Sequence, residues 1–175
     1  MLIDLSELLF HEDKSLNLFV NLEMECFTTR FYNYPVADKK PMLFKISKTE
    51  GKKVEILAEI ELTLVIPCDR CLEDVKNQIK INTSREVDLS ETEEARREAL
   101  EDVDYVDGMM FDTEKFAYGE ILVNLPMKVL CSENCKGICN RCGTNLNHEN
   151  CGCDTTELDP RMAKALEVFN SFKEV

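Results

Sequence analysis

The chain has 175 residues, of which 44% are hydrophobic, and its formal net charge at pH 7 is −13. This length and composition are enough to bury a core as one domain with an appendage, so wholesale disorder is excluded. The sequence contains no run of about eighteen apolar residues, which excludes a membrane-spanning helix and predicts a soluble protein. The negative charge argues against nucleic-acid binding over a broad surface, because phosphate contacts depend on Lys and Arg.

The acidic residues gather in one segment. Residues 86–114 contain twelve Asp and Glu residues against Arg96 and Arg97, which leaves a net charge of only −3 for the rest of the chain. We interpret its Glu-rich part, residues 90–102, as a solvated face, with repulsion of RNA or the docking of a basic protein as the alternatives. The sequence leaves open the alternative that another face of the molecule is neutral or basic.

The N-terminal part predicts short elements. Residues 1–10 mix apolar and acidic positions and predict a short strand followed by a helical turn. Residues 16–24 alternate between apolar and polar positions, which predicts a strand with one buried face. Cys26 has no other cysteine nearby in the sequence, so we expect it to be a buried small side chain.

The next segments predict an antiparallel sheet. Residues 42–46 alternate, a turn follows at residues 50–52, and residues 54–66 then alternate without interruption. This pattern predicts a β-hairpin with a long second arm. Residues 75–89 predict the next strand, which returns antiparallel to that arm.

The second half predicts helices. Residues 90–102 form a charged helical candidate capped by Ser90, and residues 104–112 resemble a loop. A helix is expected to open at Asp112 or Thr113. Its predicted apolar stripe, before Pro126, consists of Phe116, Ile121, Leu122 and Leu125.

We therefore predict an α+β fold, with mostly antiparallel strands in the N-terminal half. Residues 1–130 form the β-rich body in this interpretation, and residues 131–153 form a cysteine-rich zinc knuckle. Residues 154–175 form a C-terminal helix that begins at Asp159-Pro160 and packs on the body. Two helices thus flank the knuckle.

The knuckle is the main chemical motif of the chain. Six of the nine cysteines lie between Cys131 and Cys153. Cys139 and Cys142 form a Cys-x-x-Cys pair directly followed by a glycine, and Cys151 and Cys153 flank another glycine. A tight turn at such a pair points backbone N–H groups at the sulfurs, and four thiolates complete a tetrahedral Zn²⁺ site.

Several alternatives compete with zinc at the cysteines. A disulfide framework requires an oxidising compartment, but Met1–Glu7 lacks the basic and apolar regions of an export signal, so we expect a reducing cytoplasm. An iron–sulfur cluster uses the same ligands and would absorb at about 400 nm. His148 is expected to be an exposed loop residue, with a role as substitute zinc ligand as the alternative.

Several segments resemble the YceD family. They are Pro67-Cys68-Asp69-Arg70-Cys71-Leu72-Glu73, the run ILVNLP at 121–126, CKGICNRCGTNLN at 135–147, and Asp159-Pro160-Arg161. The resemblance implies a bacterial ribosome-biogenesis role in accumulation of the large-subunit (23S) rRNA. Some family members lack the cysteines, which implies a structural metal. Asn140 stands where cysteine-bearing relatives commonly have proline, which affects only the rigidity of the knuckle.

The number of metal sites is left open between two arrangements. In the first, Cys139, Cys142, Cys151 and Cys153 form one zinc site. Cys68, Cys71, Cys131 and Cys135 then form a second zinc site that joins the two halves of the chain. In the other arrangement, one zinc is bound by Cys135, Cys139, Cys142 and either Cys151 or Cys153, and Cys68 and Cys71 are free thiols.

The leading function is a non-enzymatic, zinc-binding factor with rRNA, a pre-50S particle or a large-subunit ribosomal protein as partner. We expect no membrane partner and no small-molecule substrate. The candidate RNA contacts are Lys128, Lys136, Arg141, Arg70 and Arg161, of which Arg161 has a local ion pair as its alternative role.

Two enzyme classes are the alternatives. A thiol-disulfide redox protein would use Cys68 and Cys71, with Arg70 lowering a thiol pKa, although this pair follows an antiparallel arm. A hydrolase or transferase is not expected, because the chain has only two histidines and no Gly-rich phosphate loop.

Overall fold

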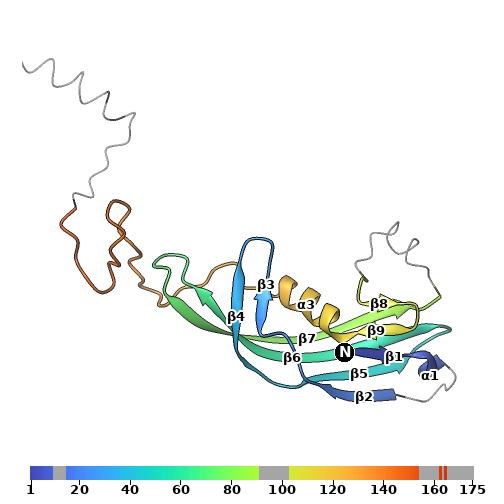
Figure 1. The fold of residues 1–175 in the computed structure, drawn as a ribbon. Helices are drawn as coiled ribbons and strands as arrows, with labels where there is room; N and C mark the ends of the chain where they lie inside the picture. The colour runs from blue at the N-terminus through green and yellow to red at the C-terminus, as the bar shows by residue number, and fades with distance from the viewer. Residues whose placement is uncertain (10–14, 91–102, 154–161, 163, 165–175) are drawn as a thin grey trace, which may run out of the picture.

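The computed structural model describes residues 1–9, 15–90 and 103–153, together with Met162 and Lys164 (Figure 1). Most described residues with regular structure lie in antiparallel strands, as the sequence predicted. The elements are β1 (Leu2–Asp4), α1 (Ser6–Leu9), β2 (Ser15–Val20), β3 (Cys26–Thr28), β4 (Asn33–Lys39), β5 (Met42–Lys48), β6 (Lys53–Pro67), β7 (Asp74–Asp88), β8 (Val106–Asp107), β9 (Met110–Asp112) and α3 (Thr113–Val123).

Strand β6 is the centre of the large sheet. Its apolar residues alternate strictly, so that one face is buried along the whole strand. β7 pairs with all fifteen residues of β6, from Lys53↔Asp88 to Pro67↔Asp74. On the other edge, β5 pairs with residues 54–59 of β6, and β4 pairs with residues 62–64. β2 extends the sheet beyond β5, and β3 extends it beyond β4, while β7 lies alone on the opposite edge of β6.

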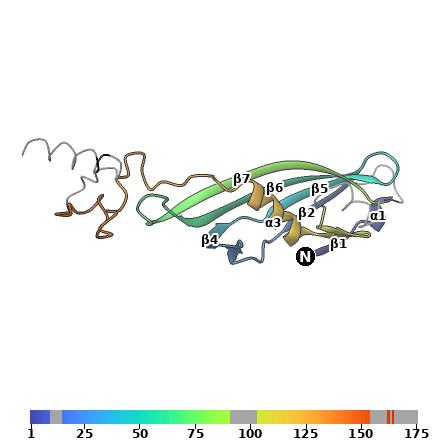
Figure 2. The same cartoon turned by 90° about the horizontal axis from the view of Figure 1, so that it is seen from above.

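The core lies between this sheet and a second layer. Helix α3 and the small sheet β1-β9-β8 lie on one face of the large sheet (Figures 1 and 2). Phe44 of β5, Phe111 of β9 and Phe116 of α3 are buried and pack edge to face, with ring centroids 5.5–5.7 Å apart. This aromatic cluster holds the two layers together.

The long hairpin of β6 and β7 leads to the cysteine segment. Its turn, residues 68–73, lies at the end of the sheet away from β1 and α1 (Figures 1 and 2). Residues 131–153, which follow α3, lie beside that turn and beyond it. The fold therefore separates a packed body from a cysteine-rich end.

The structure corrects three local predictions. Residues 104–112 are not a loop, because β8 and β9 form a short hairpin around Gly108, whose φ is +58°. Cys26 is exposed and not buried, because Phe27 takes the inward position of β3 and neighbouring residues of a strand face opposite sides. Leu122 is exposed, because the buried side of α3 ends with Glu120 and Ile121, and the next residue turns by about 100°.

The helix predictions have a mixed outcome. Helix α3 begins after Asp112, whose carboxylate accepts hydrogen bonds from the N–H groups of Glu114 and Lys115. The described residues also contain α1, which matches the helical turn predicted within residues 1–10 but is not one of the two helices expected around the knuckle. The helices expected at 90–102 and 154–175 lie outside the described residues, apart from Ser90, Met162 and Lys164. Among the described residues, no helix has the length and apolar character needed to cross a bilayer.

The aromatic cluster gives a stability prediction. Replacing Phe44 with Ala removes a buried ring, so the free energy of unfolding should fall by about 3–5 kcal/mol in urea denaturation. Phe19→Ala is the matched control, because Phe19 is 77% exposed; its effect should stay within about 0.5 kcal/mol. Equal losses in both variants would contradict the assignment of Phe44 to the core.

Candidate metal centres

The first group of four cysteines, the first tetrad, joins two distant parts of the chain. Cys68 and Cys71 lie in the turn between β6 and β7, and Cys131 and Cys135 follow α3. All four sulfur atoms lie within 4.8 Å of one another. The Sγ atoms of Cys68 and Cys135 are 3.8 Å apart, and those of Cys71 and Cys131 are 3.4 Å apart.

These distances fit a tetrahedral metal site. Sulfur atoms about 2.3 Å from a central Zn²⁺ define a tetrahedron with edges of about 3.8 Å. The sulfur separations in the first tetrad are close to that edge length, and they are far longer than the roughly 2 Å of a disulfide bond. The donor set is therefore compatible with a metal ion bound by four thiolates.

A tight turn directs the first two sulfurs. The N–H of Cys68 donates to the carbonyl of Glu73 (2.8 Å), and the N–H of Leu72 donates back to the carbonyl of Cys68 (2.9 Å). Leu72 has a φ of +63°, in the left-handed region that non-glycine residues rarely adopt. The backbone thus bends sharply at the point where both side chains must face one centre.

Residues on both sides of the first tetrad bond to each other. The N–H of Asp69 donates to the carbonyl of Val129 (2.9 Å), and the N–H of Val129 donates to Asp69 Oδ2 (2.6 Å). Arg70 donates through Nη1 to the carbonyl of Cys135 (2.8 Å). A Cβ on Gly137, whose φ is +79°, would lie 3.0 Å from the Arg70 carbonyl oxygen, so this close approach requires glycine.

Hydrogen bonds around Cys68 favour its thiolate. Burial raises the pKa of this thiol, but the N–H groups of Cys71, Arg70 and Cys131 outweigh that effect and lower the pKa to about 6. The N–H of Cys131 lies 3.3 Å from Cys68 Sγ, and that of Arg70 lies 3.5 Å away. Donors aimed at a sulfur stabilise the charged form that binds metals.

The second tetrad lies within one short segment. Cys139, Cys142, Cys151 and Cys153 have sulfur atoms within 4.8 Å of one another. The N–H of Gly143 donates to the carbonyl of Cys139 (2.9 Å), and Gly143 has a φ of +75°. This turn repeats the bond from Leu72 to Cys68, with glycine in the left-handed position. The two Cys-x-x-Cys pairs therefore have the same local geometry.

The thiols of the second tetrad have opposite pKa shifts. A hydrogen bond between the Thr144 hydroxyl and Cys142 Sγ (3.2 Å), helped by the N–H of Thr144, lowers the pKa of Cys142 to about 6. The bond to Cys142 and burial raise the pKa of Cys153 to about 12. Closely packed sulfurs repel one another when all are ionised, and a divalent cation removes that repulsion.

Two side chains connect the tetrads. Asn147, in the loop of the second knuckle, donates through Nδ2 to Cys135 Sγ of the first tetrad (3.3 Å). Its Oδ1 accepts from the N–H of Lys136 (2.7 Å). The next residue, His148, pairs with Glu73 in the turn before β7 and belongs to neither tetrad. The loop that supports the second tetrad thus also contacts the first.

The structure brings the eight predicted ligands together as two groups of four, the grouping expected for two sites, and their binding of metal stays a prediction. The single-site alternative does not match this geometry, because Cys135 groups with Cys68 and not with Cys139. All nine cysteines are free of disulfides. The tetrads can hold metal ions, and the identity of the metal stays a prediction.

The predicted RNA contacts differ in their location and in the bonds that they form. Lys128, Lys136 and Arg141 are exposed and lie in or next to the cysteine segment. Arg70 is also exposed, but its guanidinium is used in the bond to the Cys135 carbonyl. Arg161 lies outside the described residues. The structure thus gives Arg70 a supporting role at the first tetrad.

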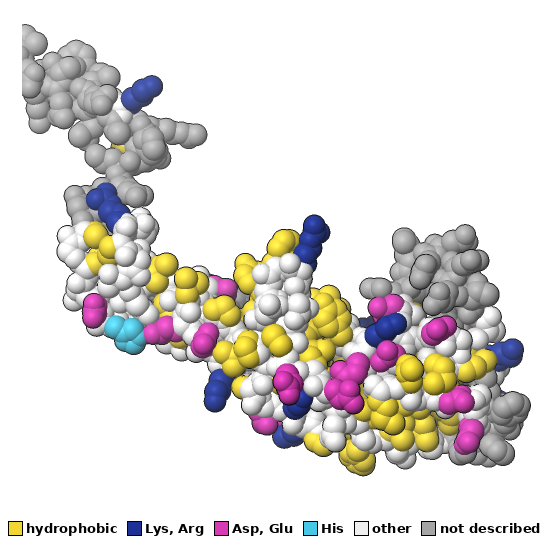
Figure 3. Space-filling model, viewed as in Figure 1, with side chains coloured by type: hydrophobic (Ala, Val, Ile, Leu, Met, Phe, Trp, Pro, Cys, Tyr) yellow, Lys and Arg dark blue, Asp and Glu magenta, His cyan; other side chains and the backbone are white. Residues whose placement is uncertain are grey.

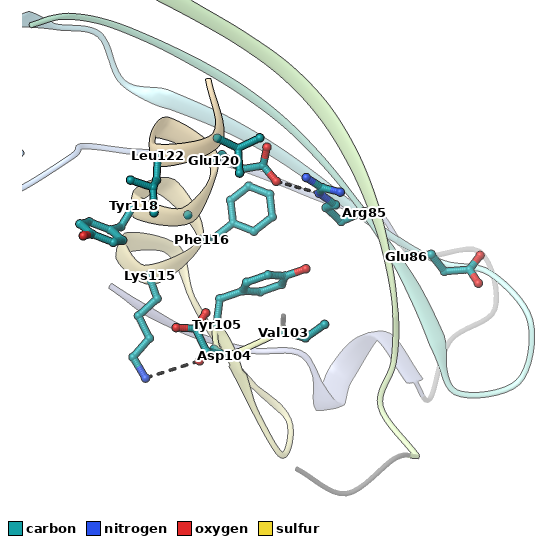
Figure 4. A pocket seen from close by; sticks show the side chains of 12 residues that line it. Arg85, Glu86, Val103, Asp104, Tyr105, Lys115, Phe116, Tyr118, Glu120 and Leu122 are labelled. Atoms are coloured by element: carbon teal, nitrogen blue, oxygen red, sulfur yellow. Dashed lines mark hydrogen bonds and ion pairs between the residues drawn. The ribbon is translucent and has the colours of Figure 1, made fainter. Parts of the chain in front are cut away.

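A cavity of about 410 Å³ lies between β7 and α3. Arg85 and Glu120 face each other there, and Arg85 Nε donates to Glu120 Oε1 over 2.7 Å (Figure 4). The described residues that line the cavity include no His, Cys or Ser. Its most buried carboxylate is thus paired with a guanidinium, and this ion pair joins β7 to α3.

Sequence reasoning missed the supporting residues. Asn147 has no property in the sequence that marks it as a sulfur contact, because its role depends on how two knuckles pack. Gly137 did carry a signal, since glycine next to a cysteine pair often marks a close backbone approach. The pairing of Glu73 with His148 joins residues 75 positions apart and has no local signature.

Comparison with known proteins identifies a protein family that matches this chain. The family model described as "Large ribosomal RNA subunit accumulation protein YceD" matches residues 56–169, which is more than half of the chain. Uncharacterised proteins of Mycobacterium bovis and Mycobacterium tuberculosis are each 28% identical over 125 residues, covering 70% of this chain and 58% of theirs. The chain thus spans less than two thirds of the length of these relatives. No solved structure is significantly similar.

The geometry gives a prediction for metal content. The purified chain should contain two zinc ions by elemental analysis, because each tetrad provides four thiolates. The double variant Cys68→Ser, Cys71→Ser should contain one, while Cys26→Ser should keep two. A wild-type content of one zinc, retained in the double variant, would rule out two sites. Absorbance at about 400 nm would indicate an iron–sulfur cluster instead.

The contact from Asn147 gives a second prediction. In a background with Cys142→Ser and Cys153→Ser, Asn147→Ala should weaken zinc binding at the first tetrad by about 10- to 100-fold, because the donor to Cys135 Sγ is lost. Competition with a chromophoric chelator measures the affinity, and Asn150→Ala is the control from the same loop. Equal affinities in the two variants would show that the Asn147 contact is dispensable.

Proposed function

The chain belongs to the YceD family of large ribosomal RNA subunit accumulation proteins, and on this basis we propose a zinc-binding, non-enzymatic factor in ribosome biogenesis. It supports accumulation of the large-subunit (23S) rRNA by contacting rRNA or a large-subunit ribosomal protein on the pre-50S particle. Its place of action is the bacterial cytoplasm, where these particles assemble.

The observation that supports this proposal is the pair of tetrads. Each tetrad provides four protein ligands, and a zinc ion with four cysteine ligands keeps no open position for water or substrate. Such sites stabilise structure and do not carry out hydrolysis. Their role here is to hold residues 131–153 at the end of the β6–β7 hairpin as one shaped surface.

The charge of that surface fits a contact with RNA. Lys128, Lys136 and Arg141 are exposed around the tetrads and outnumber the exposed Glu133 and Glu149 of the same segment. The most acidic part of the chain, residues 86–114, lies in a different region of the sequence. Phosphate groups attract such cations and are repelled by carboxylates. No small-molecule substrate is part of the proposal.

The thiol-disulfide alternative has one favourable observation, the lowered pKa of Cys68. Against it, Cys68 is fully buried and Cys71 is 5% exposed, whereas reactive thiols require access for a substrate disulfide. A thiol-disulfide exchange assay separates the two functions. The metal-bound pair should be inert until a chelator is added.

Sedimentation tests the proposed function. In the cells from which the protein derives, the tagged full chain should migrate with pre-50S particles in a sucrose gradient and crosslink to 23S rRNA. The triple variant with Ala at Lys128, Lys136 and Arg141 should lose the RNA crosslinks, most clearly at moderate salt, because three phosphate contacts are removed. Depletion of the protein should lower the amount of 23S rRNA.

A second triple variant controls for net charge. Lys45, Lys52 and Lys80 are exposed residues of the large sheet and its turn, so their replacement by Ala changes the charge equally but spares the cysteine segment. This variant should crosslink like the wild type. Absence of the wild-type protein from pre-50S fractions, together with normal 23S rRNA after depletion, would exclude the role in assembly.

A further inference from the structure

The hairpin of β3 and β4 carries exposed aromatic rings at its tip, residues 29–34. Phe31 is 79% exposed and Tyr32 is 61% exposed, although such rings are usually at least half buried. Figure 3 shows this hairpin projecting from the body with hydrophobic side chains and a basic group at its end. Neither the aromatic cluster of the core nor the tetrads involve these rings.

The tip is a defined turn. The N–H and the hydroxyl of Thr29 both donate to the carbonyl of Tyr32, over 2.7 and 3.0 Å. The N–H of Tyr32 donates back to the Thr29 hydroxyl over 3.0 Å. These three bonds close the turn on both sides of Arg30 and Phe31. Its rings are thus presented by a fixed backbone, which reduces the ordering entropy lost on binding.

The rings are arranged as stacking surfaces. The Tyr32 and Tyr34 rings are nearly parallel, at 19° with centroids 6.0 Å apart. The Arg30 guanidinium lies over the Phe31 ring, with its central carbon 5.6 Å from the ring centroid. Planar aromatic and guanidinium groups provide the surfaces on which proteins stack unpaired nucleic-acid bases.

Strand β3 of the hairpin packs against α3. The Tyr118 ring stacks on Phe27 of β3 with centroids 4.9 Å apart, and its hydroxyl donates to the carbonyl of Thr28 (3.0 Å). Lys39 Nζ donates to the carbonyl of Met24 (2.9 Å), which fixes the other side of the hairpin base. The hairpin is therefore closed at its own base by Lys39 and anchored on α3 through Tyr118.

Its charge distinguishes the tip from the rest of the chain. Residues 26–36 contain Arg30 and no acidic residue, in a chain with a net charge of −13. The side chains of Thr28 and Asn33, also in this segment, offer hydrogen-bonding groups of the kind that contact base edges. A polyanion meets no carboxylate from this segment, and a guanidinium is available for a phosphate or a base.

We propose that the tip of the β3–β4 hairpin binds single-stranded RNA by stacking unpaired bases on Phe31 and Tyr32, with Arg30 contacting the backbone or a base. This inference rests on the proposed function, since it names unpaired rRNA segments as the ligand. It adds a contact surface separate from the basic residues of the cysteine segment. Duplex RNA is a poor ligand, because its bases are already stacked on one another.

Direct binding tests the proposal with a fluorescein-labelled twelve-nucleotide single-stranded RNA and the purified zinc-loaded full chain. The double variant Phe31→Ala, Tyr32→Ala should bind about 10- to 100-fold more weakly, the range expected for the loss of base–aromatic stacking. Tyr32→Phe keeps a ring and should bind like the wild type. Phe19→Ala, which removes an exposed ring of β2, should also leave the affinity unchanged.

A spectroscopic signal identifies stacking. The chain has no tryptophan, so Tyr32→Trp introduces a single indole at the tip. Its emission should be quenched by the single-stranded RNA and not by a duplex of the same sequence. Equal RNA affinity of wild type and the double variant, or an unquenched indole at saturating RNA, would overturn the proposal.

Sedimentation separates this proposal from the proposed function. If the wild type migrates with pre-50S particles but the double variant binds the oligonucleotide normally, only the stacking proposal fails. The stacking proposal also fails if the double variant no longer migrates with the particles but keeps its RNA affinity, because the tip then contacts a protein and not RNA. If the wild type binds the oligonucleotide through the tip but never migrates with pre-50S particles, stacking stands and the assembly role fails.

Discussion

Strand β6 forms backbone hydrogen bonds along both edges, and the positions of the other elements depend on this double pairing. One edge is occupied by β7 over all fifteen residues, and the other is shared by β5 and β4. Because side chains alternate along a strand, a slip of one residue in any of these registers would expose the buried row of β6. The β5 pairing also brings Phe44 to the face where Phe111 and Phe116 complete the core.

The same register determines where the metal centres lie. The last pair of the ladder, Pro67↔Asp74, leaves six residues for the turn, and Cys68 and Cys71 are among them. Residues after α3 return along the hairpin and meet this turn through Asp69 and Val129. Only then can Cys131 and Cys135 approach the first pair. Backbone pairing in the body thus positions a site built from sequence segments that lie far apart.

The sequence predicted this part of the fold well because its signals are local. Alternation in β6 and the Cys-x-x-Cys pair at its end are readable in consecutive residues, as is the cap at Asp112. Strands β3 and β4 had no such signal, because Pro35 and a register shift between Val36 and Asp38 interrupt their pattern. The exposure of Cys26 followed from the strand that was missed. The partners of Asn147 and Gly137 depend on tertiary packing, which no local pattern encodes.

The first tetrad also affects the unfolded chain. Cys71 and Cys131 are 60 positions apart, so a metal ion that joins them closes a loop containing β7 and α3. By the chain-entropy relation for cross-links, closing a loop of that size restricts the unfolded state by about 4 kcal/mol, compared with about 3 kcal/mol for the fifteen residues from Cys139 to Cys153. The first tetrad therefore acts on the conformational freedom of residues 71–131, whereas the second constrains only its own short segment.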